Sequence, residues 1–246
     1  MIEMVDIYKC YGSKNAVDGI SLKVGVGEVF GFLGPNGAGK TTTLKMLTGI
    51  LRPTSGQIFI GGENIEKSPE SCKSIIGFVP DRPYIYEKLR GWEFIEFIMD
   101  LYNIRSTSTE SLAHEYFELF AIDFAKDQMI EDYSHGMKQK LVILSSLLHR
   151  PRVLVIDEPM VGLDPRGART LKKVFANLAS EGVSIFLSTH TMSVAEEVCD
   201  RISIINNGKV LATGSMQELR ERESSDDSLE ALFLKITEEE SEEVKG

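Results

Sequence analysis

The stretch that most constrains this chain is residues 30–43, which read FGFLGPNGAGKTTT. The spacing Gly34-x-x-x-x-Gly39-Lys40-Thr41 is that of a phosphate-binding loop set between a strand and a helix. Glycines let consecutive backbone N–H groups curl around phosphate oxygens, and a helix that begins near Gly39 directs its positive end at the same anion. Lys40 would supply a charge for the β- and γ-phosphates, and the Thr41 hydroxyl would bind Mg²⁺. The motif therefore predicts a nucleotide site.

Hydrophobic patterning around this loop predicts an α/β core. Alternation over 2–8 and 15–24, with a turn at 11–14, predicts an antiparallel β region at the N-terminus. Further strands are expected at 28–33, 57–60, 75–80, 153–156, 184–188 and 202–205, and helices at 40–48, 171–180 and 194–198. Short, continuously apolar strands that alternate with helices are typical of a buried, mostly parallel sheet.

The spacing of apolar residues changes at about residue 88 and again at about residue 150. From about residue 88 to 150 apolar residues recur at helical spacing, which predicts a helical subdomain inserted into the core. The expected organisation is an ATPase-sized domain over 1–220, with its core at 1–87 and 151–220, followed by a tail over 221–246. In that tail Leu229, Leu232, Phe233 and Ile236 form an apolar stripe, so a short amphipathic helix over 228–236 is expected to pack on the core, and the acidic run 238–243 is expected to be disordered.

Composition narrows the class of protein. The 246 residues include 27 basic and 37 acidic side chains, a net charge of −10 that argues against a nucleic-acid partner. No apolar run approaches the roughly 20 residues of a membrane-spanning helix. The three cysteines lie far apart, so neither a disulfide framework nor a zinc site is indicated, and a reducing cytosolic compartment is expected.

A second candidate site lies where the strand 153–156 ends in Asp157 and Glu158. Open α/β sheets bind ligands at the carboxyl ends of their strands, so both carboxylates are expected beside the phosphate-binding loop. There Asp157 would hold Mg²⁺ through water, and Glu158 would accept a proton from the water that attacks the γ-phosphate. Because Pro159 follows, the pair would also suit the solvated cap of a turn; the phosphate-binding loop favours the chemical roles.

A third segment, residues 133–137 with the sequence YSHGM, stands directly before an amphipathic helix. Ser134 is a favourable N-cap, and Gly136 leaves backbone N–H groups open to an anion. Read alone, the segment is an ordinary helix start. We refer to residues 133–137 below as the signature segment.

The order of these motifs resembles the ATP-binding cassette family over about residues 1–237. The phosphate-binding loop is followed by the helical block, the signature segment, the strand that ends in Asp-Glu, the run 162–164 (GLD) and a strand that ends in Ser-Thr-His at 188–190. The resemblance implies a P-loop NTPase of cassette type that binds ATP and Mg²⁺ and hydrolyses ATP. Phrases such as GFLGPNGAGKTTT and the ending SLEALFLKIT are similar to ATPase subunits of ABC-2-type exporters.

The resemblance also implies roles for single residues. Tyr11 matches the aromatic residue that stacks on adenine, although a buried tyrosine at a strand end would look the same in the sequence. Asp157 matches the metal-coordinating acid, Glu158 the catalytic base, and His190 the switch histidine that contacts the γ-phosphate. The residues that match the phosphate-binding loop, with Lys40 also acting in catalysis, are Gly34, Asn36, Gly37, Gly39, Lys40, Thr41 and Thr42.

Other matches concern a second subunit. Ser134 and Gly136 match the signature that contacts ATP bound to the other subunit, and Asp164 matches the loop that crosses between subunits. The resemblance therefore implies a head-to-tail pair of ATPase subunits, identical or different, around two ATP molecules. It further implies a separate transmembrane permease that holds the pair at the cytoplasmic face of the membrane.

The chain departs from the family pattern at two places. Where the family usually has a glutamine that touches Mg²⁺, this chain has Asp81, whose shorter carboxylate would bind the metal more strongly or fail to reach it. In the signature segment, His135 and Met137 replace a glycine and a glutamine. A histidine at this place predicts pH-sensitive turnover between about pH 5.5 and 7.5.

Two other functions are compatible with parts of this sequence. A soluble cassette ATPase in translation or DNA maintenance is the main alternative, but such proteins usually carry tandem cassettes or a long coiled-coil insertion, and the acidic charge disfavours nucleic acid. A small-molecule kinase with the same loop would leave the signature segment and His190 unexplained. The expected function is thus the ATPase subunit of a membrane transporter, most simply an exporter.

Overall fold

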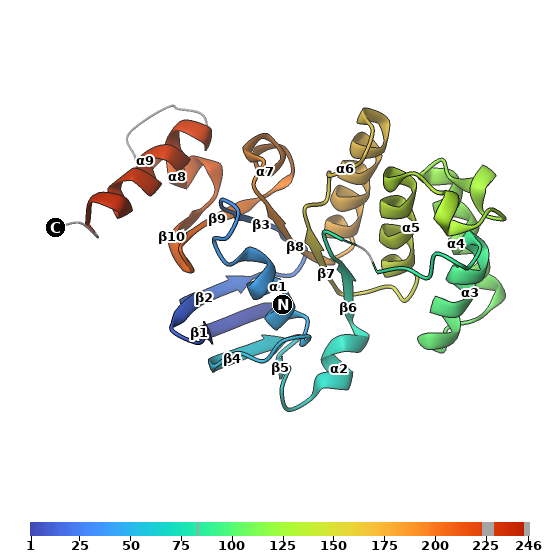
Figure 1. Ribbon diagram of the computed structural model, residues 1–246, viewed down its shortest axis with the longest axis horizontal. Coiled ribbons are helices and arrows are strands. Elements are labelled where there is room, and N and C mark those ends of the chain that lie inside the picture. Colours follow the sequence, from blue (N-terminus) through green and yellow to red (C-terminus); the bar gives the residue numbers. More distant parts are fainter. Residues whose placement is uncertain (83, 223–228, 244–246) are drawn as a thin grey trace.

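The apolar strands form a six-stranded sheet through the centre of the molecule (Figure 1). The computed structural model describes residues 1–82, 84–222 and 229–243. In spatial order the strands are β10 (Lys209–Gly214), β9 (Arg201–Asn206), β3 (Val29–Leu33), β8 (Ser184–Thr189), β7 (Val153–Asp157) and β6 (Ile76–Val79). Neighbouring strands from β9 to β6 are parallel, and β10 is antiparallel to β9. The predicted, mostly parallel core sheet is confirmed.

The N-terminal region forms a second, antiparallel sheet. Its strands follow the order β2 (Lys14–Val24), β1 (Ile2–Tyr11), β4 (Ser55–Ile60) and β5 (Glu63–Asn64). The turn between β1 and β2 places Tyr11 opposite Lys14 at the tip of the hairpin. This sheet packs beside α1 (Lys40–Leu47; Figure 1), and Tyr11 and Lys14 at the hairpin tip line the same cavity as Lys40 of the phosphate-binding loop.

Helices cover the core sheet and build the inserted block. Those of the core are α1 (Lys40–Leu47), α2 (Pro69–Ser74), α6 (Pro165–Ser180), α7 (Met192–Val198), α8 (Met216–Arg222) and α9 (Leu229–Glu243). Those of the block are α3 (Gly91–Leu101), α4 (Thr107–Leu119) and α5 (His135–Leu147), with 3₁₀ turns at Asp123–Ala125 and Ile130–Asp132. The predicted helical subdomain is therefore present, and it lies at one end of the sheet (Figure 1).

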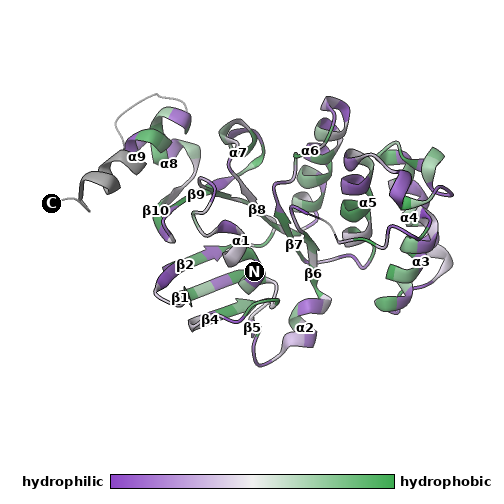
Figure 2. Cartoon of the chain, in the orientation of Figure 1, coloured by the Kyte–Doolittle hydropathy of each residue, from purple (hydrophilic) through white to green (hydrophobic). Residues whose placement is uncertain are grey.

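Buried apolar side chains tie these layers together. One cluster joins the helical block to the sheet, with Phe94, Phe117 and Leu144 packed in the same core as Leu154. A second joins the antiparallel sheet and α1 to the core sheet, where the rings of Phe30 and Phe186 stack 5.6 Å apart. Hydrophobic residues accordingly concentrate along β7 and β8 (Figure 2). Each large apolar side chain buried in this way contributes about 1.5–3 kcal/mol to folding.

Several element boundaries differ from the expectation. Helix α6 begins at Pro165 rather than near residue 171, because the Asp164 carboxylate caps it by accepting from the Gly167 N–H at 3.1 Å. The short elements β5, α2 and α8, whose sequences are mostly polar, were not predicted. Strand β10 was also not predicted, because its apolar residues Val210, Leu211 and Ala212 are consecutive and show no alternation. Residues 238–243, expected to be disordered, instead continue helix α9 to Glu243.

The predicted tail helix does pack on the core. The four residues of its apolar stripe, Leu229, Leu232, Phe233 and Ile236, are each at most 8% exposed. Ser228, its expected first residue, and the end of the tail at 244–246 lie outside the described residues. None of the helices in the described part of the chain is long and apolar enough to cross a membrane.

Candidate functional site

The loop between β3 and α1 is shaped by glycines that no other residue could replace without a shift. Gly39, the N-cap of α1, has φ of 109°, and a Cβ there would lie 2.4 Å from the Ala16 carbonyl oxygen. At Gly34, a Cβ would lie 2.3 Å from the Ile205 carbonyl oxygen. Both distances are far below van der Waals contact, so the loop can lie this close to its neighbours only with glycine at these two positions.

Lys40 lies folded beneath this loop. Its side chain is only 7% exposed, and its Nζ donates to the carbonyl oxygens of Gly34 at 2.7 Å and Pro35 at 3.2 Å. Burial lowers the pKa of Lys40 from its ordinary 10.5, an effect that the nearby negative charges of Glu158 and Asp157 partly oppose. The loop therefore holds a desolvated cation that an anionic ligand would stabilise.

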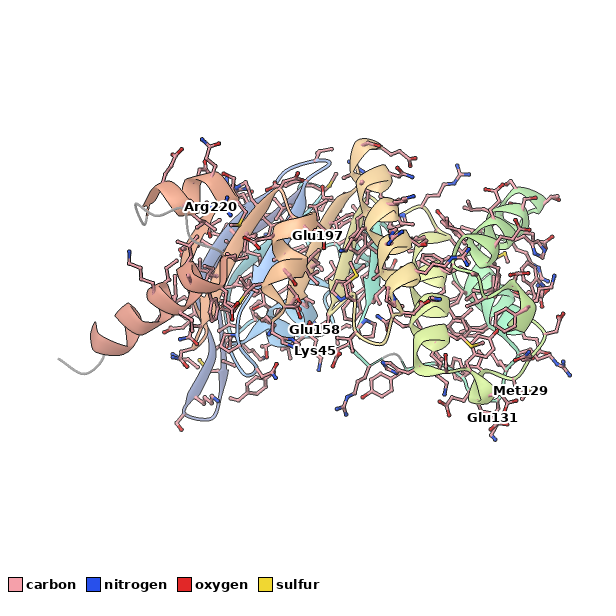
Figure 3. All side chains as sticks on the ribbon, turned by 90° about the horizontal axis from the view of Figure 1, so that it is seen from above. Lys45, Met129, Glu131, Glu158, Glu197 and Arg220 are labelled. Carbon is pink, nitrogen blue, oxygen red and sulfur yellow. The ribbon has the colours of Figure 1, made fainter. Side chains whose placement is uncertain are left out.

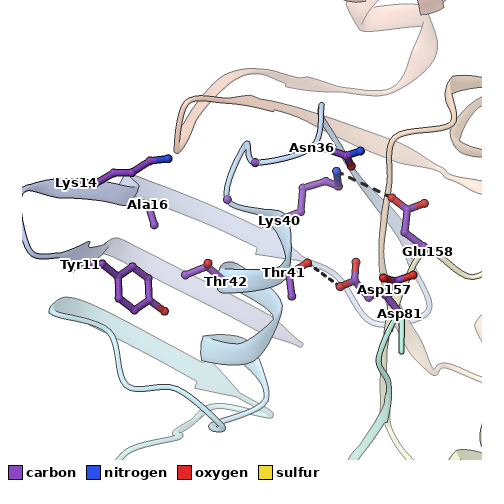
Figure 4. A pocket seen from close by; sticks show the side chains of 12 residues that line it. Tyr11, Lys14, Ala16, Asn36, Lys40, Thr41, Thr42, Asp81, Asp157 and Glu158 are labelled. Carbon is purple, nitrogen blue, oxygen red and sulfur yellow. Dashed lines mark hydrogen bonds and ion pairs between the residues drawn. The ribbon is translucent and has the colours of Figure 1, made fainter. Parts of the chain in front are cut away.

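Asp157 and Thr41 form a compact oxygen pair opposite the loop (Figure 4). Asp157, at the end of β7, is 3% exposed, and its Oδ2 accepts a hydrogen bond from the Thr41 hydroxyl at 2.8 Å. Its Oδ1 accepts from the hydroxyl of Ser188 on the neighbouring strand β8. Hydroxyl and carboxylate oxygens are ligands that suit Mg²⁺. In the described part of the chain no group of three or more His, Cys, Asp or Glu side chains could hold a metal ion.

Glu158 is held in an unusual conformation. Its φ of 50° lies in the left-handed region, which for a residue other than glycine costs about 1–3 kcal/mol. The Oε1 accepts from the backbone N–H of His190 at 3.1 Å and lies 2.7 Å from its Nδ1, while Oε2 accepts from the Thr189 hydroxyl at 3.0 Å. Lys40 Nζ lies 4.0 Å away. A carboxylate on a strained backbone, held in one orientation by Thr189 and His190, suits a residue that must point at a reacting group.

These residues surround a cavity of about 340 Å³. It is lined by Tyr11, Lys14, Ala16, Asn36, Gly37, Gly39, Lys40, Thr41, Thr42, Asp81, Asp157 and Glu158. Figure 4 shows Tyr11 at one end, Lys40 in the middle, and Asp81 with the two other carboxylates at the far end. Tyr11 is 53% exposed, so it is not the buried tyrosine that the sequence left as an alternative. An aromatic ring, a cation and carboxylates along one cavity offer contacts suited to the base, the phosphates and the metal ion of a nucleoside triphosphate.

Two lining residues were not anticipated from the sequence. Lys14 and Ala16 enter the cavity because the β1–β2 hairpin folds over the loop. The predicted turn at 11–14 could have indicated that Lys14 lies opposite Tyr11, as the structure shows. Ser188, which fixes Asp157, was also missed as a site residue, although the sequence placed it at the end of a strand.

Ser134, Gly136 and Asp164 lie outside this cavity lining. Ser134 caps α5 by accepting from the Met137 N–H at 3.2 Å. A Cβ at Gly136 would lie 2.5 Å from the Gly162 carbonyl oxygen, so the signature segment sits directly against the loop that leads to Asp164. Lys140 Nζ lies 3.3 Å from the Asp164 carboxylate, and this contact lowers the pKa of Asp164. These residues thus form a second polar surface, separate from the cavity.

His190 and Gly34 also fall outside the cavity lining but touch residues within it. His190 contacts Glu158, as described, and Gly34 contacts Lys40 through its carbonyl oxygen. The ring of His135 lies against Gly162, because a Cβ added at Gly162 would overlap the His135 ring. The structure therefore brings the predicted residues into two groups, one around the cavity and one at the starts of α5 and α6.

Comparison with known proteins adds an independent finding. Residues 17–161 match the family model described as ABC transporter. Over 206 residues the chain is 38% identical to an uncharacterised ABC transporter ATP-binding protein of Nostoc, covering 83% of this chain and 61% of that protein. It is 35% identical to the linearmycin resistance ATP-binding protein LnrL of Bacillus subtilis, covering 97% of this chain and 76% of that protein. A solved ATP-binding subunit of an ABC transporter superposes with a TM-score of 0.92 at 30% identity, over 96% of this chain and 99% of that chain.

Proposed function

Since this chain belongs to the ABC transporter family as an ATP-binding ATPase subunit, we propose that it powers an exporter through the ATP-driven closure of two ATPase subunits. The observation that carries the proposal is the cavity in which Lys40, Thr41, Asp157 and Glu158 converge. The chemistry of its lining suits ATP, with the adenine ring placed at Tyr11 and the γ-phosphate near Glu158, two residues at opposite ends of the cavity (Figure 4).

Each residue has a distinct task in hydrolysis. Lys40 would leave its carbonyl partners for the β- and γ-phosphates, and the loop N–H groups would bind the remaining oxygens. Thr41 and Asp157 would hold Mg²⁺, which when bound supplies positive charge to the phosphates. Glu158 would take a proton from a water molecule while the oxygen of that water forms a bond to the γ-phosphorus. The bond between the γ-phosphorus and the β–γ bridging oxygen would break at the same time, and ADP would leave. His190 would orient Glu158 and the γ-phosphate through its ring.

A second subunit would complete the site. Ser134 and Gly136 stand away from the cavity of their own chain, at a surface that includes Asp164. A second copy placed head to tail would bring that surface onto the γ-phosphate, where the start of α5 offers N–H groups to an anion. Charge-assisted contacts to the γ-phosphate would hold the pair closed and would be lost after hydrolysis.

A membrane permease is the proposed partner of this pair. A groove of about 280 Å³ between the core and the helical block is lined by Ile50, Phe78, Ile98 and Tyr102, among others. Between the core and the helical block, Tyr84 is 97% and Tyr86 60% exposed. An apolar groove with exposed aromatic rings suits a short helix or loop from another protein. Export is favoured because the similar protein LnrL is named for resistance to linearmycin.

Co-purification tests the transport role. The full chain, tagged and expressed in its native host, is purified from detergent-solubilised membranes. We expect a multispanning membrane protein to co-elute in stoichiometric amount, and a Tyr84→Ala, Tyr86→Ala double variant to lose it while still hydrolysing ATP. Co-elution of ribosomes or nucleic acid in place of a membrane protein would favour the soluble alternative instead.

Proton uptake on ATP binding is expected from the burial of Lys40. The free protein holds this lysine with a lowered pKa, whereas phosphates favour its charged form, so the pKa rises when ATP binds. As the pH rises through the lowered pKa, the free protein loses this proton and ATP affinity falls, at pH values below the ordinary 10.5. Titration calorimetry at alkaline pH in two buffers of different ionisation enthalpy measures the uptake. Lys40→Arg, whose guanidinium stays charged, is the control that should show none from this position.

Asp81 is proposed to bind the metal end of the nucleotide complex. It lines the cavity with Asp157, so its carboxylate adds a negative charge where a glutamine would offer a neutral amide (Figure 4). Asp81→Asn is expected to weaken Mn²⁺ binding in the presence of ATP by about tenfold, the loss of one charge-assisted contact of roughly 1.5 kcal/mol. Electron paramagnetic resonance of Mn²⁺, used in place of Mg²⁺, reports this directly. An unchanged affinity would show that Asp81 does not reach the ion.

A further inference from the structure

The C-terminal helix α9 lies on the helix that directly follows His190. Helix α7 begins at Met192, two residues after His190, and packs on β3, β8 and α6. Helix α9 packs against α7, α8 and β10 at the outer edge of the core (Figure 1). Helix α9 therefore packs on α7, the helix that follows His190, and His190 contacts Glu158 of the cavity lining.

Apolar contact accounts for part of this arrangement. Leu229, Leu232 and Phe233 of α9 share one buried cluster with Ala195, and Met192 and Cys199 pack against it. Leu229 is fully buried and Leu232 is 1% exposed. Helix α7 is seven residues long, and this cluster joins it to α9 in addition to its packing on β3, β8 and α6.

A charged side chain fixes the two helices in register. Glu196 of α7 accepts from the backbone N–H of Leu229, the first residue of α9, at 3.2 Å. The same Oε1 lies 3.6 Å from the guanidinium of Arg220 on α8. A carboxylate at a helix N-terminus is favoured by both the free N–H groups and the helix dipole. Glu196 thus joins α7 to both C-terminal helices at one point.

The path from α7 to the cavity is short and hydrogen-bonded. The N–H of Thr191, the N-cap of α7, donates to the Thr189 hydroxyl at 3.0 Å, and that hydroxyl donates to Glu158 Oε2 at 3.0 Å. His190, between these two threonines, meets Glu158 Oε1 through both its backbone N–H and its ring. A shift of α7 would therefore move the groups that orient Glu158.

We propose that α9, through Glu196, is a positioning element for His190 and Glu158. The inference rests on the proposed ATPase function and adds to it a role for the C-terminal helix. Neither Glu196 nor α9 touches the cavity lining, so they act on the reaction only through α7. Since Lys40 and the loop glycines bind the phosphates from the opposite side, loosening α7 should slow hydrolysis and leave ATP binding intact.

A neighbouring glutamate provides a matched control. Glu197 is also on α7, but its carboxylate pairs with Lys172 of α6 rather than with the C-terminal helices. Figure 3 labels Glu197, Arg220 and the site residue Glu158. Replacing Glu196 or Glu197 with alanine removes the same side chain from the same helix, and only the first change cuts the connection to α9.

The experiment measures steady-state ATP hydrolysis and the equilibrium dissociation constant for ATP in the full chain. Glu196→Ala should lower kcat by about 5–20-fold, less than the 10² that a misplacement near 1 Å can cause, with the ATP dissociation constant changed less than twofold. Glu196→Gln keeps an oxygen that can accept from Leu229 and should restore most of the rate. Glu197→Ala should keep kcat within twofold of the wild-type value. The thermal midpoints of Glu196→Ala and Glu196→Gln should match that of Glu197→Ala.

Each outcome separates the two levels of the proposal. Equal rates for Glu196→Ala and Glu197→Ala would overturn the positioning role while leaving the ATPase assignment intact. A loss of ATP affinity and of thermal midpoint together, at unchanged kcat for the bound fraction, would show that α9 only stabilises the fold. Absence of hydrolysis by the wild type would refute the proposed function itself.

Discussion

Glu158→Gln is expected to lower the turnover number for ATP hydrolysis by about 10²–10⁴, the contribution of a positioned general base. The amide keeps the shape of the side chain and an oxygen that can accept from Thr189 and His190, so the surrounding hydrogen bonds can persist. It cannot take the proton of the attacking water. ATP affinity should remain within a fewfold of wild type, because Lys40 and the loop N–H groups are unchanged. Single-turnover hydrolysis and equilibrium binding of ATP measure the two quantities separately.

The control for this variant is Glu131→Gln. Glu131 is an exposed residue of the helical block, paired with Lys88 at 2.5 Å, and Figure 3 shows it at the end of the molecule away from Glu158. The same chemical change there should leave turnover unaltered. Normal turnover by Glu158→Gln would show that another group accepts the proton and that the strained backbone at Glu158 serves a different purpose.

Lys40→Ala is expected to abolish productive ATP binding. The variant loses the one lysine that the loop buries beneath itself, and with it charge-assisted bonds to the phosphates of about 1.5–3 kcal/mol each. The dissociation constant for ATP should rise at least a hundredfold, which corresponds to about 2.7 kcal/mol, the loss of one or two such bonds. Equilibrium dialysis with labelled ATP measures this change.

Lys45→Ala is the matched control for that change. Lys45 lies on the same helix α1 but is exposed in its last turn, away from the residues that line the cavity. Its removal should leave ATP affinity within twofold. Equal losses in the two variants would mean that general positive charge, and not the position of Lys40, governs binding.

The phosphate-binding loop was predictable because its function imposes a local pattern. Glycines, a lysine and a hydroxyl at fixed spacing describe the backbone as well as the chemistry, so the loop between β3 and α1 follows from a few consecutive residues. The parallel core sheet was predictable for a similar reason, since buried strands such as β7 and β8 are apolar along their whole length. The residues of the tail helix that pack inward followed from its helical period.

Features that depend on distant contacts were not predictable. The hydrogen bond from Ser188 to Asp157 joins two strands separated by a long helix and two loops, and no local signal marks it. The positive φ of Glu158 occurs where its backbone N–H donates to the Ser188 carbonyl oxygen and its carboxylate accepts from the Thr189 hydroxyl. Short elements such as β10 and α8 pack against neighbouring elements, while their own sequences show only weak periodicity. The link from α9 to His190 belongs to the same class, because it passes through α7.

The signature segment lies outside the lining of the cavity, and this separation bears on how many copies of the chain the proposed site needs. By resemblance, Ser134 and Gly136 are expected to contact ATP bound to another subunit, and in the structure they lie outside the lining of their own chain's cavity. Under the proposed function a single copy would present two half-sites. The requirement for a second copy is a proposal about assembly, and the mass of the ATP-bound protein is the quantity that decides it.

Light scattering of Glu158→Gln after size exclusion is the measurement that tests this account most directly. The variant binds ATP but turns it over slowly, so a closed pair should accumulate with Mg-ATP and not with Mg-ADP. The account predicts a shift from one chain of 27.4 kDa to two chains with ATP, and no shift when Ser134→Arg is added to block the second surface. A mass of one chain at saturating ATP would contradict it, and would show that Ser134 and Gly136 do not complete the site of another copy.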